Sequence, residues 1–340
     1  MGSGGVAIAA LPTVICFKVT FSDGLGGGYL ETFFRRLNEC GVRYCVLRNY
    51  KSLPQSAGGS DVDMWVHADD VEKALCVSET TKNECGYHLV SKFGDATAVK
   101  LCFQNEYDGI QIDLFCGAIY YRNRVLLDGE VIEKHTHAYN GIAVMQDDLG
   151  NLLAFLKEIL NNEKCERKYV EPVVGNAVFS VPYLKEVFPY FPPSFIAELH
   201  RLINKGITDD KAIARLADAG RQALSHSTGV SKFGILWHKL LRLFRHPGYV
   251  IAIENLREYG ETQRLVDLLE GGFHHGVMVC DKQPTAKQVL LTFFKAKVLL
   301  VDRKSYHSWL HPKPDIVADA SLPIEELMRG IVKKMARRFE

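Results

Sequence analysis

The stretch Gly58-Gly59-Ser60-Asp61-Val62-Asp63-Met64-Trp65-Val66 places two carboxylates at the start of a short apolar strand. Side chains of a strand alternate between its faces, so Asp61 and Asp63 share one face while Val62 and Met64 share the other. Two such carboxylates repel each other unless a cation lies between them or one is protonated. They predict a site for a hard divalent cation, Mg²⁺ or Mn²⁺, completed by phosphate and water oxygens. Taken alone, the pair favours the alternative of a solvated turn at a strand end.

A third carboxylate lies on a second apolar strand. After a predicted hairpin turn at residues 105–109, the strand at 110–115 carries one acid, Asp113, between Ile112 and Leu114. A carboxylate on a buried strand is costly unless it is paired or bound to metal. The three acids together therefore favour a metal site. The alternative is that Asp113 faces solvent, because Gln111 shares its face of the strand.

Further elements are predicted around these two strands. Residues 87–93 and 96–103 read as strands that extend the sheet antiparallel to the Asp113 strand. Lys100 lies on this extension, either as an exposed cation of the sheet or as a partner of Asp113 or of a phosphate. Apolar residues at helical spacing predict helices at 29–40 and 147–160. Residues 134–137 read as a polar turn, and Arg122 and Arg124 are placed in a loop.

This order of segments resembles the polymerase-β-like nucleotidyltransferase superfamily over roughly residues 28 to 160. The Leu-Arg-Asn, Leu-Pro and Gly-Ser-Asp-x-Asp pattern is similar to a bacterial and archaeal branch linked to surface-polysaccharide genes. The resemblance implies Mg²⁺-dependent transfer of a nucleoside monophosphate from an NTP to a hydroxyl acceptor, such as a sugar or glycan intermediate. It implies metal binding and catalysis by Asp61, Asp63 and Asp113, and nucleotide binding by Arg48, Asn49, Gly59, Ser60 and Lys100.

The chain departs from the family pattern after the first predicted strand, at residues 43–49. Arg48 and Asn49 stand where many members have Gly-Ser, and a Gly-Gly-Ser turn lies beside the acids instead. A guanidinium can bind phosphate oxygens, so Arg48 is the predicted substitute for that turn. The departure keeps a second function open, a catalytically inactive scaffold that binds a nucleotide or a partner protein.

The C-terminal part alternates strands and helices. Strands at 249–253, 277–281 and 298–302 with intervening helices predict a small parallel α/β layer. This part resembles a thymidylate-kinase-like P-loop domain. Residues 254–262 lack both the lysine and the glycines of the phosphate-binding loop, which implies a degenerate remnant that does not phosphorylate. The remnant would serve structure, partner binding or acceptor binding.

Composition sets the remaining expectations. The 340 residues are 47% hydrophobic and 24% charged with a net charge of +1, which gives no signal for bulk nucleic-acid binding. The nine cysteines form no C-x-x-C pair and predict reduced thiols in a cytoplasmic protein. The apolar run at 6–17 is too short to span a bilayer, so no transmembrane segment is predicted.

The predicted fold class is α/β (α+β) in four segments: an N-terminal arm at 1–26, a mixed-sheet nucleotidyltransferase-like domain at 27–165, a helical region at 166–246 and the α/β layer at 247–340. Within the helical region, residues 231–244 read as an amphipathic helix with basic residues on its wet face.

Overall fold

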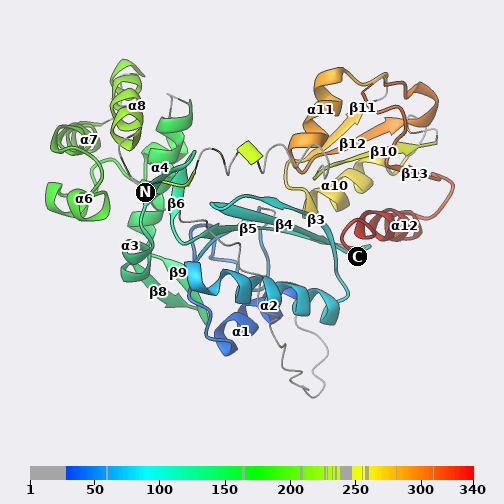
Figure 1. Cartoon of the computed structure of the whole chain (residues 1–340), viewed down its shortest axis with the longest axis horizontal. Coiled ribbons are helices and arrows are strands. Elements are labelled where there is room, and N and C mark those ends of the chain that lie inside the picture. The colour runs from blue at the N-terminus through cyan, green and yellow to red at the C-terminus, as the bar shows by residue number, and fades with distance from the viewer. Residues whose placement is uncertain are drawn as a thin grey trace, which may run out of the picture.

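The computed structural model describes residues 28–58, 60–162, 165–206, 210–225, 227, 229–231, 233, 236–237, 247–254, 256, 260–280, 282–308 and 310–340. The predicted arm at 1–26, Gly59 and most of the predicted helix at 231–244 lie outside these residues. The described part is mixed α/β, with a large mixed sheet, a group of helices beside it and a small parallel sheet on the other side (Figure 1).

The large sheet has seven strands in the order β3-β4-β5-β2-β1-β9-β8. Its strands are β1 Tyr44–Val46, β2 Val62–Val66, β3 His88–Gly94, β4 Ala98–Gln104, β5 Gly109–Cys116, β8 Thr136–Tyr139 and β9 Ile142–Met145. β2 and β5 run parallel, with Asp63 opposite Asp113, and β4 runs antiparallel to β5, with Lys100 opposite Asp113. The predicted antiparallel extension of the sheet is therefore confirmed.

One face of this sheet is covered by α1 Tyr29–Glu39 and α2 Val71–Glu84, which follows the short η1 Ala68–Asp70 (Figure 1). As the helical spacing predicted, α1 buries Leu30, Phe33, Phe34 and Leu37. They share a core with Val62, Met64, Ile112 and Leu114 of the central strands. Because strand side chains alternate, Asp63 and Asp113 point to the opposite face.

That opposite face is covered from two sides. α4 Asp147–Asn162 packs beside Trp65 and Phe115, in a core that continues into α7 Pro193–Lys205 and α8 Asp210–Ser225. The shorter elements on this side are α3 Gly129–Lys134, α5 Arg167–Val170 and α6 Val181–Val187. The carboxylates lie between this helical side and the C-terminal part of the chain.

The C-terminal part contains a four-stranded, fully parallel sheet in the order β11-β12-β10-β13, which confirms the predicted parallel layer. Its elements are β10 Tyr249–Ile253, α10 Thr262–Gly272, β11 Val277–Cys280, α11 Ala286–Phe294, β12 Val298–Asp302, η3 Arg303–Ser305, β13 Ile316–Ala318 and α12 Ile324–Ala336.

The C-terminal part packs directly on β3, β4 and β5. Val90 and Cys102 of the large sheet share a core with α10 and α12. The Tyr249 hydroxyl donates to the Val90 carbonyl at 2.5 Å, and Gln104 Nε2 donates to the Leu268 carbonyl at 2.9 Å. The Gln104 bond holds α10 on β4, the neighbour of the strand that carries Asp113.

Two local predictions are wrong, and one short strand was not predicted. Residues 134–137, expected to form a polar turn, contain instead the end of α3 and the start of β8. β8 is an edge strand that pairs only with β9 in the described sheet, and polar side chains are compatible with such an edge. Arg124 lies not in a loop but in β7 Arg124–Leu127, which pairs with β6 Ile119–Tyr121 through a turn at Arg122, where φ is 58°. β13 was not predicted because its three residues are too few to show a period.

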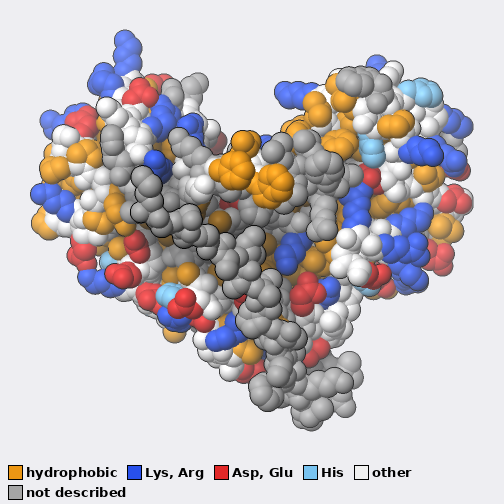
Figure 2. Space-filling view, viewed as in Figure 1, with side chains coloured by type: hydrophobic (Ala, Val, Ile, Leu, Met, Phe, Trp, Pro, Cys, Tyr) orange, Lys and Arg blue, Asp and Glu red, His pale blue; other side chains and the backbone are white. Residues whose placement is uncertain are grey.

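Charges are mixed on the surface. In the described part of the face shown in Figure 2, Lys and Arg side chains alternate with Asp and Glu over both lobes. Among the described residues, no helix combines the length and the hydrophobicity needed to cross a lipid bilayer.

Candidate active site

Asp61, Asp63 and Asp113 meet on one face of the large sheet. Each contributes a carboxylate oxygen, and the three oxygens all lie within 4.8 Å of one another. Asp63 and Asp113 sit side by side in the parallel pairing of β2 and β5, and Asp61 immediately precedes β2. Asp63 is buried, with 5% of its surface exposed. The alternation argument from the sequence predicted the shared face of Asp61 and Asp63, and the family resemblance added Asp113 to them.

Two side-chain cations pair with these acids. Arg48 Nε donates to Asp63 Oδ2 at 2.5 Å, and Arg48 Nη2 lies 3.8 Å from Asp61 Oδ1. Lys100 Nζ lies 2.7 Å from Asp113 Oδ2. Of the two interpretations of Lys100, the structure selects the acid partner. The repulsion among the carboxylates is thus offset by protein cations, and electrostatic crowding alone does not require a metal ion.

Gln111 connects the acids and was not selected by the sequence analysis. Its Nε2 lies 3.4 Å from both Asp61 Oδ2 and Asp113 Oδ1, and the residue is buried. The alternative that Gln111 and Asp113 share a solvent-facing side is wrong, because the face they share is the one enclosed by α4 and α10. The signal was available in the sequence, since a glutamine two residues before an acid on one strand lies on the same face.

The environment of Asp113 changes its protonation. Burial is the largest effect and, with the nearby charges of Asp63 and Asp61, raises the pKa of Asp113 to about 6, although Lys100 opposes the shift. A carboxyl group with a raised pKa keeps its proton at a pH where an ordinary aspartate has lost it. Asp113 is thereby suited to exchange a proton near neutral pH.

This pKa gives a pH dependence for metal binding. Below pH 6, Asp113 is protonated and a divalent ion must displace that proton, so Mg²⁺ affinity of the wild-type chain is expected to fall by up to about tenfold per pH unit. Above pH 6 the contribution of Asp113 should be constant. Calorimetric titration with MgCl₂ between pH 5 and 8 measures the effect, with Asp113→Asn as the control. A wild-type profile with the same slope as the variant would contradict it.

The donor set suits a hard cation. Three carboxylate groups offer oxygen ligands of the kind that Mg²⁺ and Mn²⁺ bind. The three oxygens lie within 4.8 Å of one another, so Asp61, Asp63 and Asp113 are the residues that would hold such an ion. An ion would compete with Arg48 for Asp63 and with Lys100 for Asp113.

A cavity of about 170 Å³ adjoins Asp63 on the side of α4, lined among others by Arg48, Lys157 and Tyr169. Lys157 Nζ lies 4.9 Å from the centre of the Phe115 ring, and burial lowers its pKa although Asp63 favours the charged form. Within the described part of the chain, no hydrogen bond or ion pair to the Lys157 ammonium is present. The sequence predicted this helix but not that one of its lysines lines the same cavity as Asp63, because that placement depends on tertiary packing.

The other predicted binding residues are less directly placed. Asn49 is exposed in the left-handed turn after β1, with φ 56°. The Ser60 hydroxyl donates to the carbonyls of Ala57 and Asp61, at 3.0 and 3.3 Å. Gly59 lies outside the described residues. Of the five predicted nucleotide ligands, Arg48 and Lys100 therefore contact the acids, while Asn49 and Ser60 flank them.

Comparisons of this chain with protein-family models, with curated proteins and with solved structures found no match.

Proposed function

We propose that this protein is a Mg²⁺-dependent nucleotidyltransferase of the polymerase-β-like type. The observation that carries the proposal is the convergence of Asp61, Asp63 and Asp113 on one face of the neighbouring strands β2 and β5. The resemblance of the sequence motifs to that superfamily supplies the reaction class. The acceptor is a hydroxyl-bearing compound, with a sugar or glycan intermediate favoured by the same resemblance.

In the proposed reaction, an acceptor hydroxyl oxygen bonds to the α-phosphorus of the NTP, and the bond from that phosphorus to the bridging oxygen breaks. Pyrophosphate leaves, and the hydroxyl proton passes to the Asp113 carboxylate, which lies beside Asp63 in the pairing of β2 and β5. Asp61, Asp63 and Asp113 would be the ligands of Mg²⁺. When bound, the ion would neutralise charge on the attacking and leaving oxygens.

Arg48 and Lys157 are the proposed contacts for the donor phosphates. Both line the cavity beside Asp63, whose volume of about 170 Å³ accommodates phosphate groups rather than a whole nucleotide. A partly buried ammonium that lacks an ion-pair partner is stabilised by an anionic ligand. This arrangement provides cationic groups where the chain lacks the Gly-Ser turn of other members.

Replacing Lys157 tests this role. Lys157→Gln is expected to weaken binding of tripolyphosphate by about 10- to 100-fold, because one charge-assisted contact is lost. Calorimetry without metal or acceptor measures the effect. Lys185→Gln, which removes an exposed lysine of α6, is the matched control and should bind as the wild type does. Equal binding by the wild type and Lys157→Gln would remove Lys157 from the donor site.

The function itself is tested by transfer of label. The chain is incubated with Mg²⁺, each α-³²P-labelled NTP in turn and a panel of sugar acceptors, and labelled products are separated by chromatography. Incorporation that requires Mg²⁺ and is abolished by EDTA supports the proposal. A chain that binds NTP but transfers no label to any acceptor would contradict it.

The second candidate is a catalytically inactive scaffold that binds a nucleotide or a partner. The observation that favours it is that Arg48 and Lys100 already neutralise Asp63 and Asp113. Calorimetry with NTP in the presence and absence of Mg²⁺, run beside the transfer assay, distinguishes the two. Binding that is independent of Mg²⁺, together with absent transfer, would favour the scaffold.

A further inference from the structure

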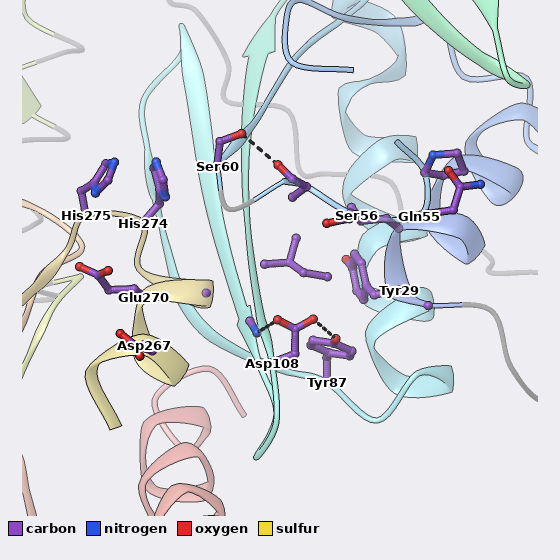
Figure 3. A pocket seen from close by; sticks show the side chains of 17 residues that line it. Tyr29, Gln55, Ser56, Ser60, Tyr87, Asp108, Asp267, Glu270, His274 and His275 are labelled. Carbon is purple, nitrogen blue, oxygen red and sulfur yellow. Dashed lines mark hydrogen bonds between the residues drawn. The ribbon is translucent and has the colours of Figure 1, made fainter. Parts of the chain in front are cut away.

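A second, larger cavity of about 380 Å³ lies on the α10 side of the acids. It is formed where residues 54–57 and Ser60, the start of α1, the turn between β4 and β5 and the end of α10 meet (Figure 3). Ser60, the residue before Asp61, lines it. The volume is within the range of about 300–1,000 Å³ that is typical of small-molecule sites.

The lining of this cavity is acidic. Its charged side chains are the carboxylates Asp108, Asp267 and Glu270, and no Lys or Arg is present among the described lining residues. Asp108 accepts hydrogen bonds from the Tyr87 hydroxyl at 3.1 Å and from its neighbouring Gly109 N–H at 2.7 Å. Asp267 accepts from Gln263 Nε2 at 2.7 Å. These two carboxylates are held in place and keep further lone pairs for a ligand.

Glu270 is the carboxylate best placed for a ligand. It is partly buried, and no hydrogen bond or ion pair to its side chain is present within the described part of the chain. His274 lies beside it on the same wall (Figure 3). Burial and the adjacent His275 lower the pKa of His274, so its ring is neutral at pH 7 and can both donate and accept a hydrogen bond.

The side of the cavity across from Glu270 carries an aromatic ring. Tyr87 is partly exposed there and packs edge to face on the buried Tyr29, with ring centroids 5.3 Å apart (Figure 3). Carboxylates and a neutral imidazole on one side, with the Tyr87 ring on the other, match a ligand rich in hydroxyl groups. A phosphate or carboxylate on the ligand would be repelled by the three acids.

We propose that this cavity binds the acceptor, and that the acceptor is an uncharged, hydroxyl-rich sugar rather than a phosphorylated one. This inference rests on the proposed function, because only that function requires an acceptor. The two cavities then divide the substrates by charge. The smaller one, with Arg48 and Lys157, takes the anionic donor, and the larger one, with Glu270, takes the neutral acceptor.

The experiment is a binding measurement that requires neither NTP nor transfer. Saturation-transfer NMR and calorimetry compare maltose, an uncharged sugar of suitable size, with glucose 6-phosphate as the anionic counterpart. The wild-type chain is expected to bind maltose at least about tenfold more tightly than the phosphate. Glu270→Lys is expected to weaken maltose binding at least about tenfold and to improve binding of glucose 6-phosphate.

Glu133→Lys, an exposed charge reversal on α3, is the control and should leave both affinities unchanged. Glu270→Gln is the second variant, used if the lysine variant does not fold. It should weaken maltose binding without increasing the affinity for glucose 6-phosphate. The inference would be overturned if the wild-type chain preferred glucose 6-phosphate or bound neither sugar. It would also be overturned if the two lysine variants changed the affinities equally. Sugar binding without label transfer would overturn the proposed function alone.

Discussion

The Asp61→Asn, Asp63→Asn double variant is expected to lose label transfer by at least about 1,000-fold. Both substitutions keep side-chain size and remove the negative charge that would hold the metal ion. Removing two of three anionic ligands weakens metal binding and with it the neutralisation of charge on the donor phosphates. The measurement is the initial rate of incorporation from α-³²P-labelled NTP at saturating Mg²⁺.

Asp69→Asn is the matched control, because Asp69 is an exposed carboxylate of η1 that pairs with Arg43, on the surface of the described chain. It should transfer label at the wild-type rate. Circular dichroism and thermal unfolding establish that the double variant is folded. Full label transfer by a folded double variant would show that the reaction takes place at another site.

Gly109→Ala is expected to lower the free energy of unfolding by about 2–3 kcal/mol. A Cβ atom at this position would lie 2.2 Å from the Gly272 nitrogen and 2.6 Å from the Gly271 carbonyl carbon. Both are backbone atoms at the end of α10, so relief requires the helix to move away from β5. The substitution would therefore also distort the cavity lined by Glu270. Urea unfolding followed by circular dichroism measures the loss.

Gly330→Ala provides the comparison, since a Cβ there meets no atom within 4 Å and the residue lies in α12. This substitution should stabilise the chain by about 0.5–1 kcal/mol, because alanine favours a helix over glycine. If the two variants unfold at the same urea concentration, the close contact between β5 and α10 contributes little to stability.

The sequence alone predicted the helices and strands whose apolar residues recur with a clear period. The apolar spacing in α1 predicted four of its five buried side chains, and the alternation in β2 predicted that Asp61 and Asp63 share a face. β8 and β13 were missed because strands of three or four residues at a sheet edge have no resolvable pattern. Short edge strands are defined by their pairing partner rather than by their own residues.

The cations around the acids could be predicted only in part. Lys100 lies directly opposite Asp113 in the register of β4 and β5, which cannot be derived until the hairpin turn is fixed. Lys157 reaches the site from α4, more than forty positions along the chain from Asp113. Its position depends on how α4 packs against Phe115, and no local pattern in the sequence predicts where a lysine of α4 lies relative to β5.

The hydrogen bond between Arg48 and Asp63 has a consequence for how substrates would bind. A divalent ion that takes the Asp63 oxygen must release the guanidinium, and the released side chain still lines the cavity proposed for the donor phosphates. Ion entry and nucleotide capture would thereby be thermodynamically linked, each raising the affinity for the other by the same factor. Arg48 would then act as an internal counterion that exchanges one anionic partner for another during each catalytic cycle.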